Sequence, residues 1–368
     1  MVILMKKLSI NKHKSIFYTF AAGICLSLFF IMVFLTLNNS KVESKEIGIE
    51  AELVSLNSDF GPRDHESLLL DNGKIYMYGG FFRGDSTYQN LLTSTDNGRN
   101  FSTIVGGVFP RNNDLSKHII PFQSDLPSGY ARFLKWNSRL YLVDRDLWLI
   151  ESNSITKVTE NFLPELNSAA ELNILKTESG ILFIDLALGR IWTFTSDLKM
   201  TSNTEFKHEG KVIKVKGATV FENNGVYFIY GGQLLGEGYD NSPRISHLNL
   251  KSADGISWAE IQVPQSNPFS SLIWPCSISD KESRTWIFGG YNLLTQENSN
   301  QAWVSKDGFN FSQVAVWEKG NKFFPRHAPG CIYLEKQNSI LVLGGKGGEN
   351  ESNDTAWVMN DVWNLKLP

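Results

Sequence analysis

Six stretches of the chain share one pattern, in which an apolar run, a short polar turn and a second apolar run follow one another. Fifteen residues superpose without a gap in all six, at Glu66–Gly80, Tyr130–Asp144, Glu171–Asp185, Ala218–Gly232, Cys276–Gly290 and Cys331–Gly345. Several turns, such as Asp71-Asn72-Gly73, contain Asn and Gly, which tolerate the positive φ angles of tight hairpins. The pattern predicts six β-hairpins, and the continuous apolarity predicts strands covered on both faces.

Further strands follow most of these hairpins. A third apolar segment often contains Trp, as in Asp146-Leu147-Trp148 and Gln301-Ala302-Trp303, and a fourth follows a tight turn in several repeats. Four strands in about 50 residues, repeated six times, predict an all-β fold, a six-bladed β-propeller. The last repeat ends after its third strand, and residues 51–56 form an additional strand before the first repeat. We predict that this strand pairs with residues 360–365 and closes the ring, which removes an exposed edge.

An uncharged apolar segment precedes the repeats. Residues 16–37 would span ~33 Å as a helix, enough to cross a hydrocarbon core of ~30 Å. Four lysines precede the segment, which predicts a cytoplasmic tail at 1–15, a transmembrane signal anchor at 16–37, a linker at 38–49 and a propeller at 50–368 on the periplasmic or extracellular side. A cleaved signal peptide is the alternative, but the apolar run is longer than such a peptide requires and lacks a small-residue cleavage site.

Composition narrows the possible chemistry. A formal net charge of −3 excludes the broad positive surface that nucleic-acid binding needs. Cys276 and Cys331 occupy the same register in neighbouring repeats; export permits a disulfide, but innermost strands can lie too far apart, so we expect two buried thiols. The six His residues show no HxH or HExxH spacing, so we predict no metal site and no cofactor.

The glycine pairs after aromatic strands, the Pro62-Arg63 and Pro325-Arg326 leads and the Trp-bearing third strands resemble kelch repeats, as found in galactose-oxidase-like propellers. The resemblance extends over roughly residues 51–368. The turn at 94–101 also resembles the Asp-box of sialidase-type propellers, and the turns at 252–258 and 305–311 are one residue shorter. The resemblance implies a structural turn, in which the Asp caps backbone donors and the aromatic residue packs between blades.

In kelch propellers the first strand of each blade lines a central channel. The resemblance therefore implies a site at the channel mouth, with Glu66 and Glu171 as catalytic candidates and with Arg63, Asp64, His65, Tyr130, Arg326 and His327 as ligand-binding candidates. Such carboxylate, guanidinium and imidazole groups can bind an anionic or sugar ligand. They can also pair with one another as structural links between blades, and the sequence leaves both interpretations open.

Long polar loops, notably 81–90, 105–127, 233–244 and 292–301, favour a membrane-anchored, non-catalytic module that binds a protein or glycan. The alternative is a cofactor-free sugar mutarotase similar to N-acetylneuraminate epimerase, with Glu66 and Glu171 as acid and base and Arg63 and Arg326 for a carboxylate. A purely structural subunit of an envelope complex is the third hypothesis.

Overall fold

Antiparallel strands make up nearly all the regular structure. The computed structural model describes residues 48–83, 86–107, 123–236, 244–262, 268–347 and 357–368. These belong to one unit, Gly48–Pro368. They contain two short 3₁₀ turns, η2 (Pro268–Ser271) and η3 (Glu335–Gln337), and no α-helix. The described residues include no helix with the length and apolarity to span a bilayer, and the predicted anchor at 16–37 lies outside them.

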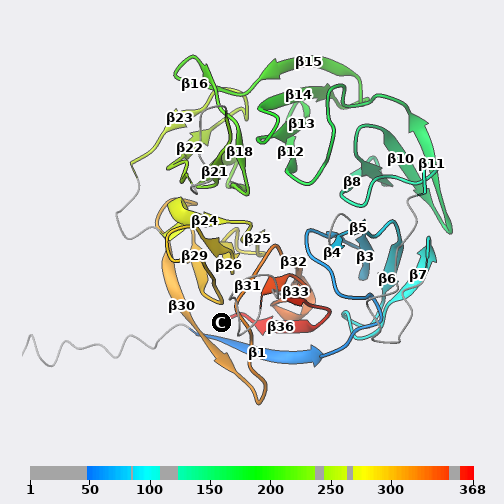
Figure 1. The fold of residues 1–368 in the computed structure, drawn as a ribbon, viewed down its shortest axis with the longest axis vertical. Coiled ribbons are helices and arrows are strands. Elements are labelled where there is room, and N and C mark those ends of the chain that lie inside the picture. Colours follow the sequence, from blue (N-terminus) through cyan, green and yellow to red (C-terminus); the bar gives the residue numbers. More distant parts are fainter. Residues whose placement is uncertain (1–47, 84–85, 108–122, 237–243, 263–267, 348–356) are drawn as a thin grey trace, which may run out of the picture. The chain divides into compact units, whose positions relative to one another are not determined.

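Five sheets of four or more strands surround a common centre (Figure 1). Four of them have four strands: β2 (Ser67–Asp71), β3 (Lys74–Tyr78), β6 (Leu91–Ser94) and β7 (Ser102–Val105); β8 (Arg132–Trp136), β9 (Arg139–Val143), β10 (Leu147–Glu151) and β11 (Ser154–Thr159); β12 (Leu172–Thr177), β13 (Gly180–Asp185), β14 (Arg190–Thr195) and β15 (Met200–Glu205); and β19 (Thr219–Asn223), β20 (Val226–Tyr230), β22 (Asn249–Ser252) and β23 (Ala259–Glu260).

The fifth large sheet has eight strands. In spatial order they are β25 (Cys276–Ser279), β26 (Thr285–Phe288), β29 (Ala302–Ser305), β30 (Ser312–Glu318), β1 (Gly48–Ser55), β36 (Val362–Lys366), β33 (Ser339–Leu343) and β32 (Gly330–Leu334). Smaller sheets are formed by β4 (Phe81–Arg83) and β5 (Ser86–Thr87); β16 (Lys207–His208) and β17 (Lys211–Val212); β18 (Val215–Lys216) and β21 (Gln233–Leu234); β24 (Leu272–Ile273), β27 (Tyr291–Asn292) and β28 (Glu297–Asn298); and β31 (Arg326–His327), β34 (Lys346–Gly347) and β35 (Trp357–Val358).

All six predicted hairpins are present, but the prediction of six separate blades was wrong. The hairpins are β2–β3, β8–β9, β12–β13, β19–β20, β25–β26 and β32–β33. They are distributed over five large sheets because β1 pairs with β36 on one side and, in parallel, with β30 on the other. The last two repeats therefore share one sheet, and the fold is all-β and propeller-like.

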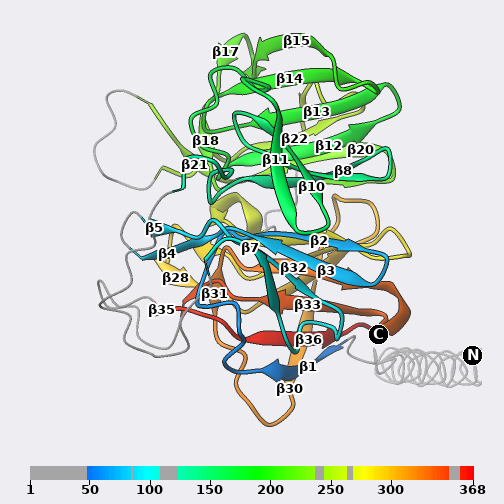
Figure 2. The same cartoon turned by 90° about the vertical axis from the view of Figure 1, so that its right-hand side faces the viewer.

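The pairing predicted for the strand at 51–56 is confirmed. Ala51 lies opposite Leu365 and Leu53 opposite Trp363 in the antiparallel pair of β1 and β36. Figure 2 shows β1 between β36 and β30 at one edge of the unit. Ile49 and Ala51 are fully buried among the aromatic residues of this sheet, so the first described strand is part of the core.

The core consists of clusters that lie between neighbouring hairpins. Leu134 of β8 packs with Phe183 and Trp192 of the next sheet. Met77 of β3 shares a cluster with Leu343 of β33, so the first hairpin packs against the last. The apolar runs of the sequence are buried on both faces because each sheet is covered by a neighbour on either side.

The three turns that resemble the Asp-box are structural, as predicted. Asp254 accepts hydrogen bonds from the backbone N–H groups of Ile256 and Ser257, and Asp96 and Asp307 accept equivalent bonds in the other two turns. Burial opposes ionisation of Asp254, but these bonds outweigh it and lower the pKa to about 2. Phe101, which ends the first turn, is buried in the cluster between the first and last hairpins.

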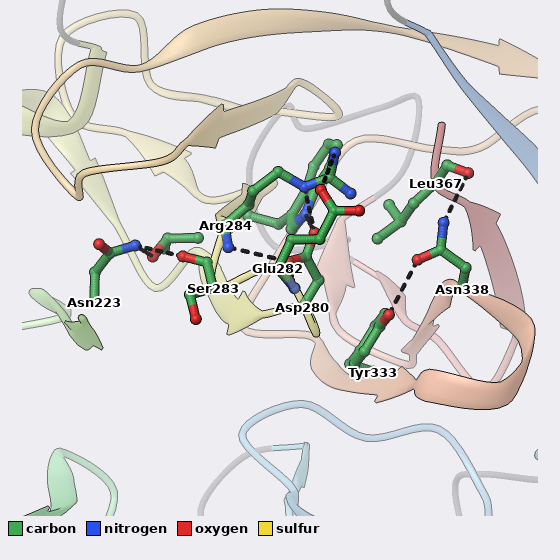
Figure 3. Close-up of polar contacts among 10 residues, drawn as sticks. Asn223, Asp280, Glu282, Ser283, Arg284, Tyr333, Asn338 and Leu367 are labelled. Atoms are coloured by element: carbon green, nitrogen blue, oxygen red, sulfur yellow. Dashed lines mark hydrogen bonds and ion pairs between the residues drawn. The ribbon is translucent and has the colours of Figure 1, made fainter. Parts of the chain in front are cut away.

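Polar side chains hold the turn between β25 and β26, the two strands of one hairpin (Figure 3). Asp280 accepts bonds from the backbone and side chain of Arg284 and from the indole of Trp286. Asn223, from the preceding hairpin, donates to the carbonyl oxygen of Ser283. The Asp280 bonds hold one hairpin turn together, and the Asn223 bond ties that turn to the preceding hairpin.

Ile49→Ala is expected to lower the free energy of unfolding by about 2–5 kcal/mol, because it leaves a cavity in the sheet that β1 completes. Leu56→Ala is the matched control, since Leu56 is 61% exposed, and should change stability by less than about 0.5 kcal/mol. Urea denaturation measures both values. Equal, small effects of the two substitutions would show that β1 is not part of the cooperative core.

Candidate functional site

Backbone hydrogen bonds link the segments that lead into the innermost strands. His65 donates its N–H to the carbonyl of Ala328 (3.0 Å), Ala328 to Trp274 (2.7 Å), and Trp274 to Gly217 (2.9 Å). All four residues have positive φ angles, of 55°, 49°, 51° and 70° in that order. A positive φ is unfavourable for His, Trp and Ala, so these bonds must compensate the strain. We refer to this chain of four residues as the inner ladder.

Two side chains complete the inner ladder. At one end, Glu171 Oε2 accepts the N–H of Gly217 (2.7 Å), and its Oε1 accepts the indole N–H of Trp274 (2.9 Å). At the other end, Arg132 donates to the carbonyl of His65 (3.0 Å) and to those of Ala169 and Ala170, directly before Glu171. The inner ladder is therefore closed into a ring by one guanidinium group and one carboxylate.

A cavity of about 170 Å³ lies beside this ring. Its walls include the polar side chains of Glu66, Arg132, Glu171 and Asn173 and the rings of His65 and Trp274. An apolar cavity of roughly 150 Å³ is known to hold benzene, so this cavity has room for a small ligand. Several polar groups next to aromatic rings are typical of small-molecule sites.

Glu66 differs from the other polar groups of the cavity. Its side chain accepts the backbone N–H of Gly330 at Oε1 (3.0 Å), and the residue is 5% exposed. The buried Oε2 has no hydrogen-bond partner within the described part of the chain. Burial raises the pKa of Glu66 to about 8, against the opposing effects of backbone hydrogen bonds and Arg63. At neutral pH this carboxyl group is therefore mainly protonated and can donate a hydrogen bond.

Four aromatic rings form a row, and two of them, those of His65 and Trp274, line the cavity. His65 contacts Tyr130 and Trp274 edge to face, with ring centroids 6.3 and 5.3 Å apart, and His327 stacks on Trp274 at 5.6 Å. Burial lowers the pKa of His327 to about 3, with smaller effects from His65 and Lys346, so its imidazole is neutral at physiological pH. Asp64 lies 3.1 Å from His65 Nδ1 and orients that ring.

Arg63 and Arg326 use their guanidinium groups inside the protein. Both are buried, and each donates to the carbonyl of the first glycine of its own repeat's glycine pair, Gly79 (2.7 Å) and Gly344 (2.8 Å). Arg326 also forms two hydrogen bonds of 2.7 and 2.9 Å with Asp361. We therefore assign both arginines to the structural links between segments, one of the two interpretations that the sequence left open.

The structure thus brings three of the sequence candidates, His65, Glu66 and Glu171, into one cavity, with Tyr130 and His327 beside it. Sequence reasoning missed Arg132, although a charged residue inside the apolar run of an inner strand was a usable signal. Most residues of two predicted recognition loops, 105–127 and 233–244, lie outside the described residues.

The expectation of two free thiols was wrong. Cys276 and Cys331 form a disulfide between β25 and β32, with Cα atoms 6.2 Å apart, inside the usual limit for such a bond. Innermost strands of adjacent hairpins approach each other more closely than we expected. The bond joins two strands that follow directly on Trp274 and Ala328 of the inner ladder.

One group of potential metal ligands occurs among the described residues. Donor atoms of His208, Glu209 and Glu260 lie within 4.8 Å of one another. Both glutamates are exposed, and neighbouring acidic side chains on a surface are common without a cation. The sequence prediction of no metal site rested on residue spacing and could not detect a group formed by separate elements.

No protein-family model and no curated protein matches the sequence. Among solved structures, one titled "Structure of YjhT" aligns with a TM-score of 0.53 at 12% identity, over 84% of this chain and 96% of that chain. A streptogramin B lyase aligns over 86% of this chain and 98% of its own, with a TM-score of 0.43 at 13% identity. Selenomethionine-substituted virginiamycin B lyase from Staphylococcus aureus aligns over 88% of this chain and 100% of its own, with a TM-score of 0.39 at 12% identity.

These similarities concern the fold. The alignment with YjhT supports a propeller-like architecture over most of the chain, and 12% identity gives no information on ligand or activity. The two lyase alignments are too distant to add to it.

Arg326→Leu is expected to lower the free energy of unfolding by about 3–5 kcal/mol, because it leaves the buried Asp361 carboxylate without its partner. Lys157→Ala breaks a partly exposed pair with Asp146 and should cost less than about 1 kcal/mol. Urea denaturation distinguishes the two. A cost for Arg326→Leu as small as that of the control would contradict the structural assignment of this arginine.

Proposed function

We propose that this protein binds a small hydroxylated ligand, the terminal sugar of a glycan, in the cavity beside the inner ladder, without changing it chemically. The observation that supports the proposal is that Glu66, a residue of the cavity lining, has a buried Oε2 without a protein partner in the described chain. Buried polar groups without a partner are unfavourable, and a ligand hydroxyl group would supply the missing hydrogen bond.

The other walls suit the same class of ligand. A sugar ring has hydroxyl groups around its edge and C–H groups on its faces, so it can meet carboxyl groups and aromatic rings together. Asn173 and Glu66 offer the polar contacts, and Trp274 offers an aromatic wall whose indole is fixed by Glu171. The walls thus combine the two kinds of surface that a sugar needs.

We propose further that the fold is of the kelch type and is held at a membrane by residues 16–37, with the propeller on the periplasmic or extracellular side. The length of the apolar segment and the four lysines before it support this placement. A glycan ligand would be accessible on that side of the membrane.

A second candidate function, a sugar mutarotase, is favoured by one observation. Glu66 and Glu171 line the same cavity, and two carboxyl groups can act as acid and base on an anomeric centre. Nuclear magnetic resonance of anomer exchange tests it with a panel of reducing sugars. Acceleration that disappears in Glu66→Gln would establish catalysis, and no acceleration by the wild-type protein would reject it.

The binding proposal is tested by calorimetry of the full chain in detergent with a monosaccharide panel and by a glycan array. Trp274→Ala should weaken sugar binding at least about tenfold, because it removes the aromatic wall. Trp317→Ala is the matched control, since Trp317 is 51% exposed and lies outside the cavity, and it should leave binding unchanged. Absence of any bound sugar would reject the proposal, as would equal effects of the two substitutions.

The membrane placement has its own test. The protein should remain in the membrane pellet after alkaline carbonate extraction, and mass spectrometry of the mature chain should find the N-terminus before residue 16. A mature N-terminus near residue 40 would instead identify a cleaved signal peptide.

A further inference from the structure

The two glutamates of the cavity have different hydrogen-bonding environments. If the cavity binds a sugar as proposed above, this difference gives the two residues different tasks. We propose that Glu66 donates a hydrogen bond from a neutral carboxyl group to an acceptor oxygen of the ligand, whereas Glu171 is a positioning residue that fixes Trp274. The ligand group at Glu66 would then be a hydroxyl, ether or carbonyl oxygen, and an ammonium group could not replace it.

Both side-chain oxygens of Glu171 already accept a hydrogen bond from the inner ladder. Its Oε2 accepts the N–H of Gly217 (2.7 Å) and its Oε1 the indole N–H of Trp274 (2.9 Å). Ionised carboxylates are acceptors only, which matches two N–H donors. In Glu171→Gln one of these donors would face an amide NH₂ group, so one of the two bonds must break.

Glu66 has the opposite arrangement. Glu66 lines the cavity, its Oε1 accepts the N–H of Gly330, and its buried Oε2 has no protein partner in the described chain. The cations around it are occupied elsewhere: Arg63 donates to Gly79 and Asn90, and Arg132 to three backbone carbonyls. No salt bridge between Glu66 and a cation occurs in the described structure, although the charge of Arg63 favours the ionised form.

The nearby acidic groups also favour the neutral form. Asp64 precedes Glu66 by two residues and interacts unfavourably with its charge. Glu171, from the segment before β12, and His65 line the same cavity. Burial and Asp64 thus outweigh the backbone donors and Arg63, consistent with a pKa of about 8.

This arrangement gives a defined pH dependence. The carboxyl group is mainly protonated at pH 7 and about one-tenth protonated at pH 9, so affinity should fall about tenfold between these values. Stability follows the same group: the folded-state pKa exceeds the ordinary value of 4.5, so its favourable contribution is complete below pH 4.5 and is lost as pH rises through about 8.

The test combines binding with a signal that needs no ligand. Calorimetry would use the full chain in detergent and the methyl glycosides of galactose, glucose and N-acetylglucosamine at pH 6–9.5. Glu66→Gln keeps an N–H donor, so it should bind sugar with affinity that is constant from pH 7 to 9. Infrared difference spectroscopy of the free protein should show a protonated carboxyl band that titrates near pH 8 and is missing in Glu66→Gln.

Glu171→Gln provides the matched comparison for the positioning role. It should keep the carboxyl band of Glu66, but the indole N–H resonance of Trp274, assigned with Trp274→Phe, should shift upfield as its hydrogen bond is lost. A general loss of protein stability would not shift the Trp274 indole resonance selectively.

The outcomes separate the two levels of the proposal. If no glycoside binds the wild-type protein, the proposed function fails, while the infrared band still reports whether Glu66 is neutral. If a glycoside binds but its affinity is constant from pH 7 to 9, or falls equally in Glu66→Gln, the donor role of Glu66 is wrong. An unchanged Trp274 indole resonance in Glu171→Gln would reject the positioning role.

Discussion

The closure of the inner ladder is the interaction on which the rest of this structure depends. Three backbone hydrogen bonds connect His65, Ala328, Trp274 and Gly217, and the ring is completed only by the side chains of Arg132 and Glu171. Three of these four residues adopt positive φ angles despite having side chains. The ring therefore holds a strained backbone in place, and the positions of the cavity walls follow from it.

Two other links hold the innermost strands against this ring. The disulfide joins β25 to β32 directly after the segments that contain Trp274 and Ala328. The strand β1 pairs with both β30 and β36, so the first described residues complete the sheet of the last repeats. A covalent bond and a shared sheet thus stabilise one side of the ring, while Arg132 and Glu171 stabilise the other. The cavity walls are consequently held in place by the fold itself, so the proposed ligand would meet a preformed site and would lose less entropy on binding.

Much of the fold could be predicted because it follows from local patterns. The six hairpins and the strand at 51–56 were identified from apolar runs and from turn residues such as Asn72 and Gly73. The parallel pairing of β1 with β30, which joins two repeats into one sheet, has no sequence signature because it depends on how distant edges meet. The sequence predicted two thiols instead of a disulfide for the same reason, since the separation of β25 and β32 is a tertiary property.

The site was predicted only in part. Position in the repeat placed Glu66 and Glu171 near one another, and both line the cavity, but it could not distinguish a glutamate with both oxygens engaged from one with an unpartnered oxygen. Arg63 and Arg326 looked like ligand-binding residues because sequence shows charge and not the acceptors that satisfy it. Arg132 was overlooked because its partners are backbone carbonyls, which a sequence does not display.

Amide hydrogen exchange in Arg132→Met tests the central claim that the closed ring holds the cavity together. The account predicts that the N–H groups of His65, Trp274 and Ala328 lose protection together, because opening the ring at one point releases the whole ladder. Protection that is unchanged, or lost only beside position 132, would contradict it.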